Sequence, residues 1–211
     1  MTKSSKSQVK SPQQSRSKEL VNAIFEATVR VLPKIGNQAL TTKKIAEIAG
    51  VSIGSLYQYF PNKEAVLMAV MDKSINETKE EVDRNIDQLE GKSVDEAIDF
   101  FIDFTIDHFL TDKETVREVF RRAPELNRIP TILDLRQHVV HRLAGVMEHH
   151  HPGLTKEDYK RISFIAVNSV LGVLQTITYD EKQTYEKAEL SFELKAMVRA
   201  YFEVRRKPPS S

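Results

Sequence analysis

Hydroxyl groups, small residues and lysines gather in one short stretch of this sequence, TTKKIAEIAGVSIGSLYQYFPNK, which runs from Thr41 to Lys63. Hydroxyl and ammonium groups donate hydrogen bonds to phosphate oxygens and base edges, and small residues let a helix approach the bases closely. The stretch therefore suits contact with a nucleic acid.

Two short helices are needed to position these groups. Thr41 and Thr42 suit the start of the first helix, because a threonine side chain can accept a hydrogen bond from a free backbone N–H group. Gly50 suits the turn, since glycine adopts the left-handed conformation that ends a helix. After the turn, Val51 and Leu56 can pack back onto the apolar edge of the first helix, which consists of Ile45, Ala46, Ile48 and Ala49. This pattern is typical of a helix-turn-helix, whose second helix enters the major groove of DNA.

The segment resembles the DNA-binding domain of the tetracycline-repressor (TetR) family of bacterial transcription regulators. The groups Thr-Thr, Ile-Ala, Ala-Gly-Val-Ser, Gly-Ser-Leu-Tyr, Tyr-Phe and Asn-Lys-Glu follow the family's order without a gap, and the likeness covers Leu20 to Val70. The resemblance implies that Thr42, Tyr57 and Lys63 contact phosphates and that Tyr59 is a further contact to the DNA backbone. It also implies that the groove is read by Lys43, Ser52, Ile53, Gly54 and Ser55.

The tip of this reading surface lacks Arg, Asn and Gln, the usual bidentate readers of bases. We therefore expect specificity to come from Ile53 against a thymine methyl group, from Lys43 and from DNA shape. Lys63 begins a helix, where free N–H groups and the helix dipole already favour an anion. Tyr59 and Phe60 have an alternative interpretation, packing against the first helix of the domain, which we favour for Phe60.

The residues 50–54 also fit the G-x-S-x-G pattern of hydrolases. That motif requires a strand before the serine, to hold it on a strained turn. Here the preceding residues, KKIAEIA, form a helical pattern, and no strand pattern occurs elsewhere. The sequence therefore predicts no enzyme and no catalytic residue.

Charge is divided unevenly along the chain, although the net charge is only +1 over 211 residues. Residues 1–65 carry ten Lys and Arg against four Asp and Glu, a net of +6, and the remaining residues carry 21 against 26, a net of −5. A basic N-terminal third joined to an acidic remainder favours nucleic-acid binding at one end.

Several classes of site and location are disfavoured by the sequence. The absence of cysteine excludes disulfides and thiolate metal sites. His149, His150 and His151 cannot share one helix face, so we predict no metal site, and no cofactor either. The first eighteen residues lack the apolar core of a signal peptide, and the apolar run 162–177 is short for a bilayer span. We expect a cytoplasmic protein with no membrane partner.

Patterning divides the chain into three parts. Residues 1–16 are predicted to be a disordered basic tail, which either extends into solvent or reaches a flanking minor groove. Residues 17–62 form the helix-turn-helix domain, whose first helix is predicted over residues 17–35 with Gly36 as its stop, and residues 63–205 form a ligand-binding and dimerisation domain. The predicted fold is all-α with about nine helices. Those that follow the helix-turn-helix cover residues 63–89, a helix opened by the capping box Ser93–Glu96, and residues 114–122, 129–150, 155–179 and 185–205.

The last two helices carry the argument for a dimer. Residues 162–174 are apolar all round the helix, so every face must be covered, and the final helix has more than one apolar stripe. Two such helices from each of two subunits would form a four-helix bundle, which the family resemblance implies, and a large monomeric core is the alternative. Asn168 lies inside this apolar helix and needs a hydrogen-bond partner, which is either a second subunit or a ligand. The predicted interface residues are Phe164, Val167, Leu171, Leu174, Leu194, Met197 and Tyr201.

A pocket for a small-molecule effector is expected among the middle helices, because the resemblance implies one. The predicted lining residues are Phe101, Phe104, His108, Phe120 and His138, which suggest an apolar or aromatic ligand, although the histidines also suit ordinary core or surface positions. The predicted function is a ligand-responsive repressor that binds a palindromic operator as a dimer. The alternatives are an activator of the same fold and a helical ligand-binding or interaction module that no longer binds DNA.

Overall fold

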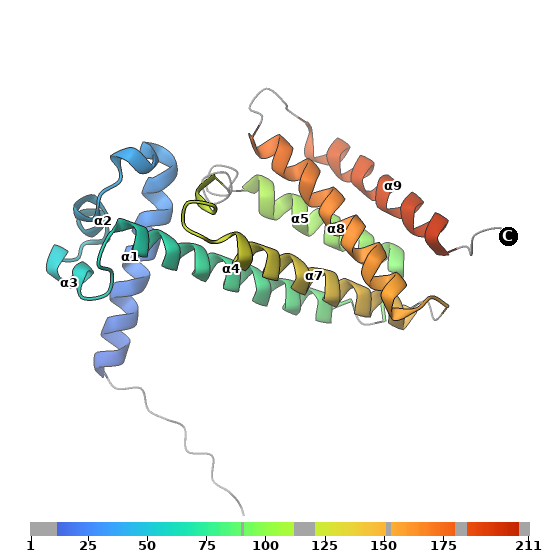
Figure 1. The fold of residues 1–211 in the computed structure, drawn as a ribbon, viewed down its shortest axis with the longest axis horizontal. Coiled ribbons are helices and arrows are strands. Elements are labelled where there is room, and N and C mark those ends of the chain that lie inside the picture. The colour runs from blue at the N-terminus through green and yellow to red at the C-terminus, as the bar shows by residue number, and fades with distance from the viewer. Residues whose placement is uncertain (1–11, 90, 112–120, 151–152, 180–184, 207–211) are drawn as a thin grey trace, which may run out of the picture. The chain divides into compact units, whose positions relative to one another are not determined.

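The computed structural model describes residues 12–89, 91–111, 121–150, 153–179 and 185–206, where all regular structure is α-helical (Figure 1). The predicted all-α class is confirmed, with eight helices in this part of the chain against the nine expected. The predicted short helix at 114–122 lies mostly outside the described residues. The helices are α1 (Pro12–Ala39), α2 (Thr42–Ala49), α3 (Ile53–Tyr57), α4 (Lys63–Asp87), α5 (Val94–Thr111), α7 (Ile129–His150), α8 (Lys156–Tyr179) and α9 (Lys187–Arg206).

The helices form two compact units, an N-terminal unit of Met1–Val70 and a C-terminal unit of Met71–Ser211. The sequence places the domain boundary at residue 62, whereas the units divide within α4, after Val70. The first two turns of α4 thus belong to the N-terminal unit, where Val66 and Leu67 are buried.

Helix α1 begins at Pro12, five residues before its predicted start at residue 17. Proline is favoured in the first turn of a helix, because its fixed φ suits the helix and its missing N–H group leaves no donor unpaired. The helix was predicted to stop at Gly36, and this residue does leave helical geometry, with a φ of 69°. The chain then resumes a helical course to Ala39, so Gly36 acts as a kink.

The core of the N-terminal unit joins its first three helices. Ile24 of α1, Ile45 of α2 and Leu56 of α3 are fully buried. Thr28 is also buried, and its hydroxyl donates to the carbonyl of Ile24 at 2.7 Å, which satisfies this polar group within its own helix. The short helices α2 and α3 are therefore fixed to α1 by their apolar faces.

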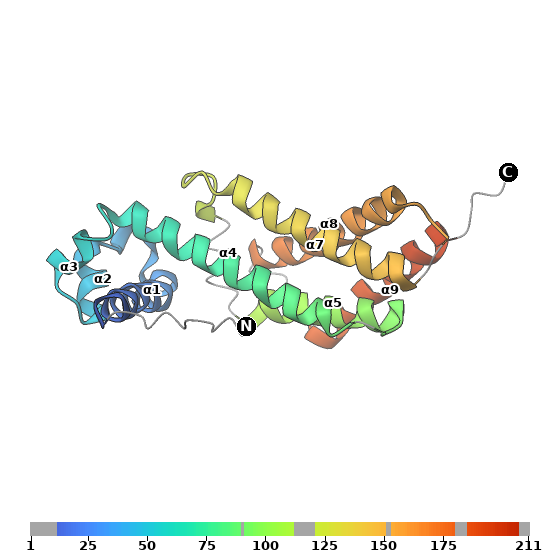
Figure 2. The same cartoon turned by 90° about the horizontal axis from the view of Figure 1, so that it is seen from below.

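The C-terminal unit is a bundle in which α7 lies along α8 and α5 lies along both α8 and α9 (Figure 2). Helix α8 is central, because nine of its residues are buried. Its apolar run is thus explained largely by contacts within this unit. The fully buried members of the core include Ile102 and Ile106 of α5 and Tyr159, Ile162, Val170 and Leu174 of α8.

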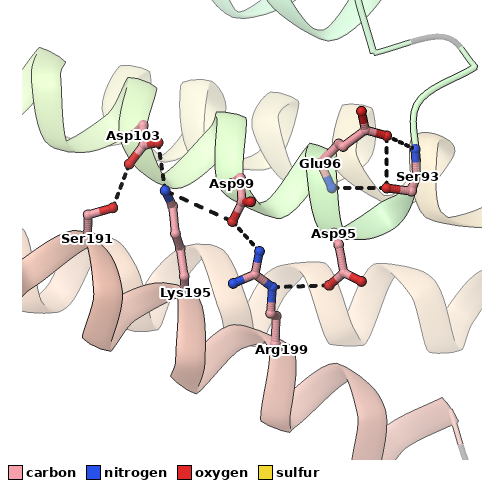
Figure 3. Close-up of polar contacts among 8 residues, drawn as sticks. All are labelled: Ser93, Asp95, Glu96, Asp99, Asp103, Ser191, Lys195 and Arg199. Carbon is pink, nitrogen blue, oxygen red and sulfur yellow. Dashed lines mark hydrogen bonds and ion pairs between the residues drawn. The ribbon is translucent and has the colours of Figure 1, made fainter. Parts of the chain in front are cut away.

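Helix α5 begins with the capping box predicted from the sequence, which the structure confirms (Figure 3). The Ser93 N–H group donates to the Glu96 carboxylate at 2.8 Å, and the Glu96 N–H group donates to the Ser93 hydroxyl at 3.2 Å. These hydrogen bonds from the backbone and the side chain of Ser93 lower the pKa of Glu96 below its ordinary value.

A row of charged pairs joins α5 to α9, and we call it the α5–α9 ladder; Figure 3 draws all of it except the pair of Lys187 and Asp107. One side is an acidic stripe on α5 and the other is a mainly basic stripe on α9, each with a residue at every fourth position. Opposite charges therefore meet along the whole seam. The ladder consists of Asp95, Asp99, Asp103 and Asp107 on α5, and Lys187, Ser191, Lys195 and Arg199 on α9.

The middle of the ladder is the most enclosed part. Lys195 donates to Asp103 at 2.7 Å and lies 4.0 Å from Asp99, with only 18% of its side chain exposed. Ser191 donates to the second carboxylate oxygen of Asp103 at 2.6 Å. Burial raises the pKa of Asp103, but the hydrogen bonds from Lys195 and Ser191 outweigh it and hold this pKa below its ordinary value. Asp103 therefore stays ionised and paired at neutral pH.

Candidate nucleic-acid interface

Helix α2 is capped at both ends by residues that the sequence marked. The Thr41 side chain accepts a hydrogen bond from the N–H group of Lys44 at 3.2 Å, which satisfies one of the free donors of the first turn. Gly50 ends the helix in the left-handed conformation with a φ of 67°, where a residue with a Cβ atom would be strained. The turn into α3 is thus set locally.

Helix α3 starts in the same way. Ser52 accepts a hydrogen bond from the N–H group of Ser55 at 3.0 Å, and the two hydroxyl oxygens lie 2.8 Å apart. Both serines, predicted as groove readers, thus help to build the helix start as well. Leu56 is fully buried and anchors the other face of this five-residue helix.

The outer face of α3 presents the remaining residues that were predicted to read the groove. Ile53 is 41% exposed, and Gly54 beside it is exposed, with no Cβ atom to keep another surface away. Lys43 on α2 is exposed as well. The structure therefore places an apolar side chain, a bare backbone and an ammonium group on the surface of this unit.

Two predicted phosphate contacts, Thr42 and Tyr57, are brought together although they are fifteen positions apart in the sequence. The Thr42 hydroxyl oxygen and the Tyr57 phenol oxygen lie 3.0 Å apart. Tyr57 is 51% exposed, so its ring extends from the end of α3 while its hydroxyl group reaches the first residue of α2. The free N–H groups and positive dipole of the α2 start lie at the same place.

Tyr59 and Phe60 differ in the way that the sequence suggested. Phe60 is buried and its ring lies 5.9 Å from that of Phe25 on α1, which confirms packing for this residue. Tyr59 is exposed, and its phenol donates to the hydroxyl of Ser17 on α1 at 2.8 Å. The Tyr59 hydroxyl is thereby held against α1.

Lys63 is tied to the end of α1 as well. Its ammonium group donates to the carbonyl of Asn37 at 2.9 Å, and the side chain is partly buried. Asn62 caps the start of α4 by accepting a hydrogen bond from the N–H group of Ala65 at 2.8 Å. An ammonium group has three donors, so one bond to Asn37 leaves others for an anion.

Ser17 and Asn37 are partners that the sequence did not mark. Each meets a predicted contact residue across a large separation, 42 positions for Ser17 with Tyr59 and 26 for Asn37 with Lys63. No local motif links such pairs, so only the packing of α1 against the helix-turn-helix reveals them.

The C-terminal unit encloses an apolar cavity between α5, α7, α8 and α9. Its volume is about 30 Å³, room for one or two water molecules. Of the five residues that the sequence assigned to a pocket, Phe101 lines this cavity. Phe120 lies outside the described residues.

Phe104, His108 and His138 do not line the cavity. Phe104 and His108 stack on one another along α5, with ring centroids 6.3 Å apart, and burial lowers the pKa of His108 while the charge of Glu81 acts in the opposite direction. His138 lies 2.7 Å from a carboxylate oxygen of Asp83 on α4, because it lies on the face of α7 that meets α4. These three residues are on helices that border the cavity, as their spacing predicted, but they lie on faces that do not line it.

Comparison with known families decides the identity of the fold and its first domain. The model described as bacterial regulatory proteins, tetR family, matches residues 24–70, and the model of the tetracycline repressor-like C-terminal domain matches residues 93–202.

The chain belongs to the TetR family. It is therefore a member of a family of DNA-binding transcription regulators, as the resemblance of its helix-turn-helix implied.

Among curated TetR-type regulators, the repressor KstR of Mycolicibacterium smegmatis is 33% identical over 61 residues, which is 29% of this chain and 30% of that protein. The fatty acid metabolism regulator protein of Bacillus subtilis is 33% identical over 63 residues, 30% of this chain and 32% of that protein. The chain thus matches about a third of the length of these relatives.

Solved structures share the fold over nearly the whole chain. A TetR-family regulator from Mesorhizobium loti has a TM-score of 0.72 at 16% identity, covering 92% of this chain and 98% of that one. FadR from Bacillus subtilis, solved in complex with stearoyl-CoA, has a TM-score of 0.63 at 20% identity, covering 84% and 96%. At this level of identity the likeness shows the TetR fold alone.

The predicted dimer residues of this TetR-family chain divide into three groups by burial. Val167, Leu174 and Leu194 are buried in the core of their own unit, so they present little surface to another subunit. Leu171 and Tyr201 are partly buried against that core. The exposed members of the set are Phe164 and Met197.

Other residues of the C-terminal unit that the sequence singled out have ordinary surroundings. The Asn168 amide donates to the carbonyl of Phe164 on its own helix at 2.8 Å. His149 is exposed, and within the described chain no group of three or more His, Asp or Glu side chains could hold a metal ion. One described helix, α8, is long and apolar enough to span a membrane, but core helices of soluble proteins also meet this criterion.

Proposed function

We propose that this chain is a ligand-responsive transcriptional repressor that binds a roughly palindromic operator as a homodimer and leaves it when a small molecule binds. The observation that carries the proposal is the pairing of Thr42 and Tyr57, 3.0 Å apart at the start of α2. Two hydroxyl groups beside the free N–H groups of a helix start suit one phosphate. Relatives that are named repressors support the sign of regulation.

On the operator, α3 enters the major groove of each half-site, and the half-sites lie one or more helical turns apart. Thr42, Tyr57 and Lys63 hold the phosphate backbone, and Tyr59 joins them by turning its hydroxyl group from Ser17 to a phosphate, since a phenol donates one hydrogen bond. Ile53 and the exposed backbone at Gly54 lie against base edges, where an isoleucine side chain favours a thymine methyl group. The groove contacts are completed by Lys43, Ser52 and Ser55. The protein acts in the cytoplasm, where bacterial DNA lies.

The operator is tested by pulling down fragmented genomic DNA with the wild-type protein and with the double variant Tyr57→Ala, Lys63→Ala. The control is Tyr179→Ala, Lys160→Ala, which removes the same groups from α8, where Tyr179 is exposed and Lys160 is half-buried. We expect the wild type and the control to enrich one palindromic site and the double variant to lose it.

Enrichment of the same site by the double variant would overturn the assigned contacts, and enrichment by none of the proteins would overturn DNA binding. Lys63→Ala alone should flatten the log–log dependence of operator affinity on salt by about 0.9 for each subunit, because one phosphate contact is lost.

The dimer is proposed to form through the outer faces of α8 and α9. These helices border a groove of about 670 Å³ lined by Asn168, Gly172, Val173 and Met197, among others. Phe164, Ile165 and Phe192 are exposed apolar side chains on the same two helices. A two-fold axis would let each subunit cover the exposed apolar surface of the other.

The dimer is tested by light scattering after gel filtration. We expect wild-type protein at twice the chain mass of 24.1 kDa, and Phe164→Asp, Met197→Asp as a monomer. Leu133→Asp, which places the same charge on an exposed apolar position of α7, is the control and should remain a dimer. If the double variant remained a dimer, the interface would have to lie on another surface.

The effector is proposed to bind by enlarging the apolar cavity of the C-terminal unit, and it must prefer the state that does not bind DNA. Ala166 lines this cavity, so Ala166→Leu should fill it. We expect that variant to bind the operator within about twofold of wild type but to ignore metabolite extracts that release the wild type. Ala188→Leu, at an exposed position of α9, is the control.

A further inference from the structure

The cavity of the C-terminal unit is walled almost entirely by hydrocarbon. Five lining residues come from α5, three from α7, four from α8 and one from α9, and Ser163 of α8 is the single residue among them with a polar side chain. No lining residue carries a charge. The chemistry of any ligand inside is therefore limited to apolar contact and one hydroxyl group.

Ser163 has an unusual partner for a buried hydroxyl group. Its side chain is fully buried, and in the described residues its hydroxyl makes one hydrogen bond, to the thioether sulfur of Met147 at 3.7 Å. A thioether is a weak acceptor. The oxygen of Ser163 accepts no bond among these residues, so most of its hydrogen-bonding capacity is unused.

The buried threonines of the same fold show the ordinary arrangement. Thr28, Thr105 and Thr178 each donate to the backbone carbonyl four residues earlier, at 2.7–2.8 Å. A hydroxyl bonded in this way is satisfied by its own helix. Ser163 lies on an equally regular helix but donates across to α7 instead, at the wall of the cavity.

Met147 also lines the cavity and covers Ser163. Methionine is unbranched and has three rotatable bonds, so it changes shape at low cost. A rotation of this side chain would both enlarge the cavity and free the Ser163 hydroxyl. The present volume of about 30 Å³ is too small for a metabolite, so some such change has to accompany binding.

We infer that Ser163 is the polar anchor of the effector, and that the effector is an apolar molecule whose buried portion carries one neutral hydrogen-bonding group, such as a hydroxyl or carbonyl. This assignment rests on the proposed function, since it places the effector in the same cavity. A carboxylate or ammonium group is excluded from the buried portion, because an unpaired ion in an apolar site loses its hydration without compensation.

The test uses Met147→Ala, which opens the cavity beside Ser163 and removes its sulfur partner. Three probes share one ring and differ in the group that they carry: cyclohexanol, methylcyclohexane and cyclohexanecarboxylate. Binding is measured by calorimetry on the full chain without DNA. We expect Met147→Ala to bind cyclohexanol and methylcyclohexane, and to bind cyclohexanecarboxylate at least a hundredfold more weakly.

The anchor itself is tested by adding Ser163→Ala to Met147→Ala. Loss of one hydrogen bond should weaken cyclohexanol about fivefold and leave methylcyclohexane unchanged. Thr178→Val in the same background is the control, because Thr178 is a buried hydroxyl on the same helix that does not line the cavity. It should alter neither affinity.

Equal weakening of both neutral probes, tight binding of the carboxylate, or no binding of any probe would each overturn the inference. Should Met147→Ala lose its cooperative unfolding transition, Val146→Ala opens the same wall by less and replaces it. Because no operator enters these measurements, failure of the anchor and failure of DNA binding are seen separately.

Discussion

The two units of this molecule position their polar groups over very different distances along the chain. In the N-terminal unit, the hydrogen bonds of the site span from three positions, between Thr41 and Lys44, to 42 positions, between Tyr59 and Ser17. In the C-terminal unit, the α5–α9 ladder joins residues 80 to 104 positions apart. The shortest of these bonds form as soon as a turn forms, while the ladder requires that a whole bundle has assembled.

This difference separates what a short motif can encode from what only a complete fold can. A cap or a turn depends on the residues around it and survives changes elsewhere. A long-range pair forms only after a large loop has closed, which costs conformational entropy. The burial of apolar surface offsets this cost. The N-terminal unit should therefore respond to mutation locally, and the C-terminal unit as a whole.

The largest expected effect comes from removing one fully buried leucine from each unit. Leu174→Ala in α8 should lower the free energy of unfolding of the C-terminal unit by about 3 kcal/mol, because it leaves a cavity in the core. Leu56→Ala should instead abolish operator binding and leave that unfolding transition in place. Urea titration followed by circular dichroism, beside an operator-binding assay, checks both; a shared transition that moves equally would contradict the comparison.

The next effect compares two rungs of the α5–α9 ladder. Lys195→Ala should cost about 1.5 kcal/mol of unfolding free energy, since it leaves the carboxylate of Asp103 partly buried without its cation. Lys187→Ala, whose side chain is 54% exposed, should cost about 0.5 kcal/mol or less. Chemical denaturation distinguishes the two, and adding Asp103→Asn should reduce the cost of Lys195→Ala. Equal losses of unfolding free energy for both lysines would show that the contribution of a charged pair does not increase with its burial.

A smaller and more local effect is expected at the start of α2. Thr41→Ala removes the cap of this helix and should destabilise the N-terminal unit by about 1 kcal/mol. Hydrogen exchange should show faster exchange in the first turn of α2 and no change in α8. Faster exchange in both units would mean that the cap acts beyond its own helix.

The smallest expected effect is a dependence on pH that only the C-terminal unit should show. All six histidines lie beyond residue 70, and burial lowers the pKa of His108 from 6.5. As the pH falls below 6.5, the unfolded chain takes up a proton at His108 that the folded chain does not, so the free energy of unfolding decreases.

His108→Gln should flatten part of this dependence. Unfolding of the wild type and the variant, measured between pH 7.5 and 5, gives the contribution of His108 as their difference. A wild-type curve no steeper than that of the variant would show that the buried imidazole does not titrate as its surroundings imply.

The elements of the site that could be predicted are the local ones. Thr41 as a cap, Gly50 as a turn and Leu56 as an anchor follow from residue type and spacing, and all three occur in the structure. The bonds of Tyr59 to Ser17 and of Lys63 to Asn37 could not be predicted, because they depend on how α1 crosses the helix-turn-helix.

In the C-terminal unit, periodicity predicted the helices but not their neighbours. His138 was assigned to a pocket and instead meets Asp83, since a one-dimensional pattern does not say which face of α7 looks toward α4. The two stripes of the ladder are present in the sequence as repeats of four. Their pairing was not predictable, because nothing local indicates that α5 lies beside α9.

The regular spacing of the ladder also has a consequence for the sliding of α9 along α5. Because each stripe repeats every four residues, the charge pattern looks almost the same after a shift of one helical turn. Lys187 would then face Asp103, Lys195 would lie between Asp99 and Asp95, and Arg199 would keep Asp95, while Asp107 would lose its lysine. The ladder thus holds the two helices together without fixing their register. The packing of Leu194 and Val198 in the core selects that register.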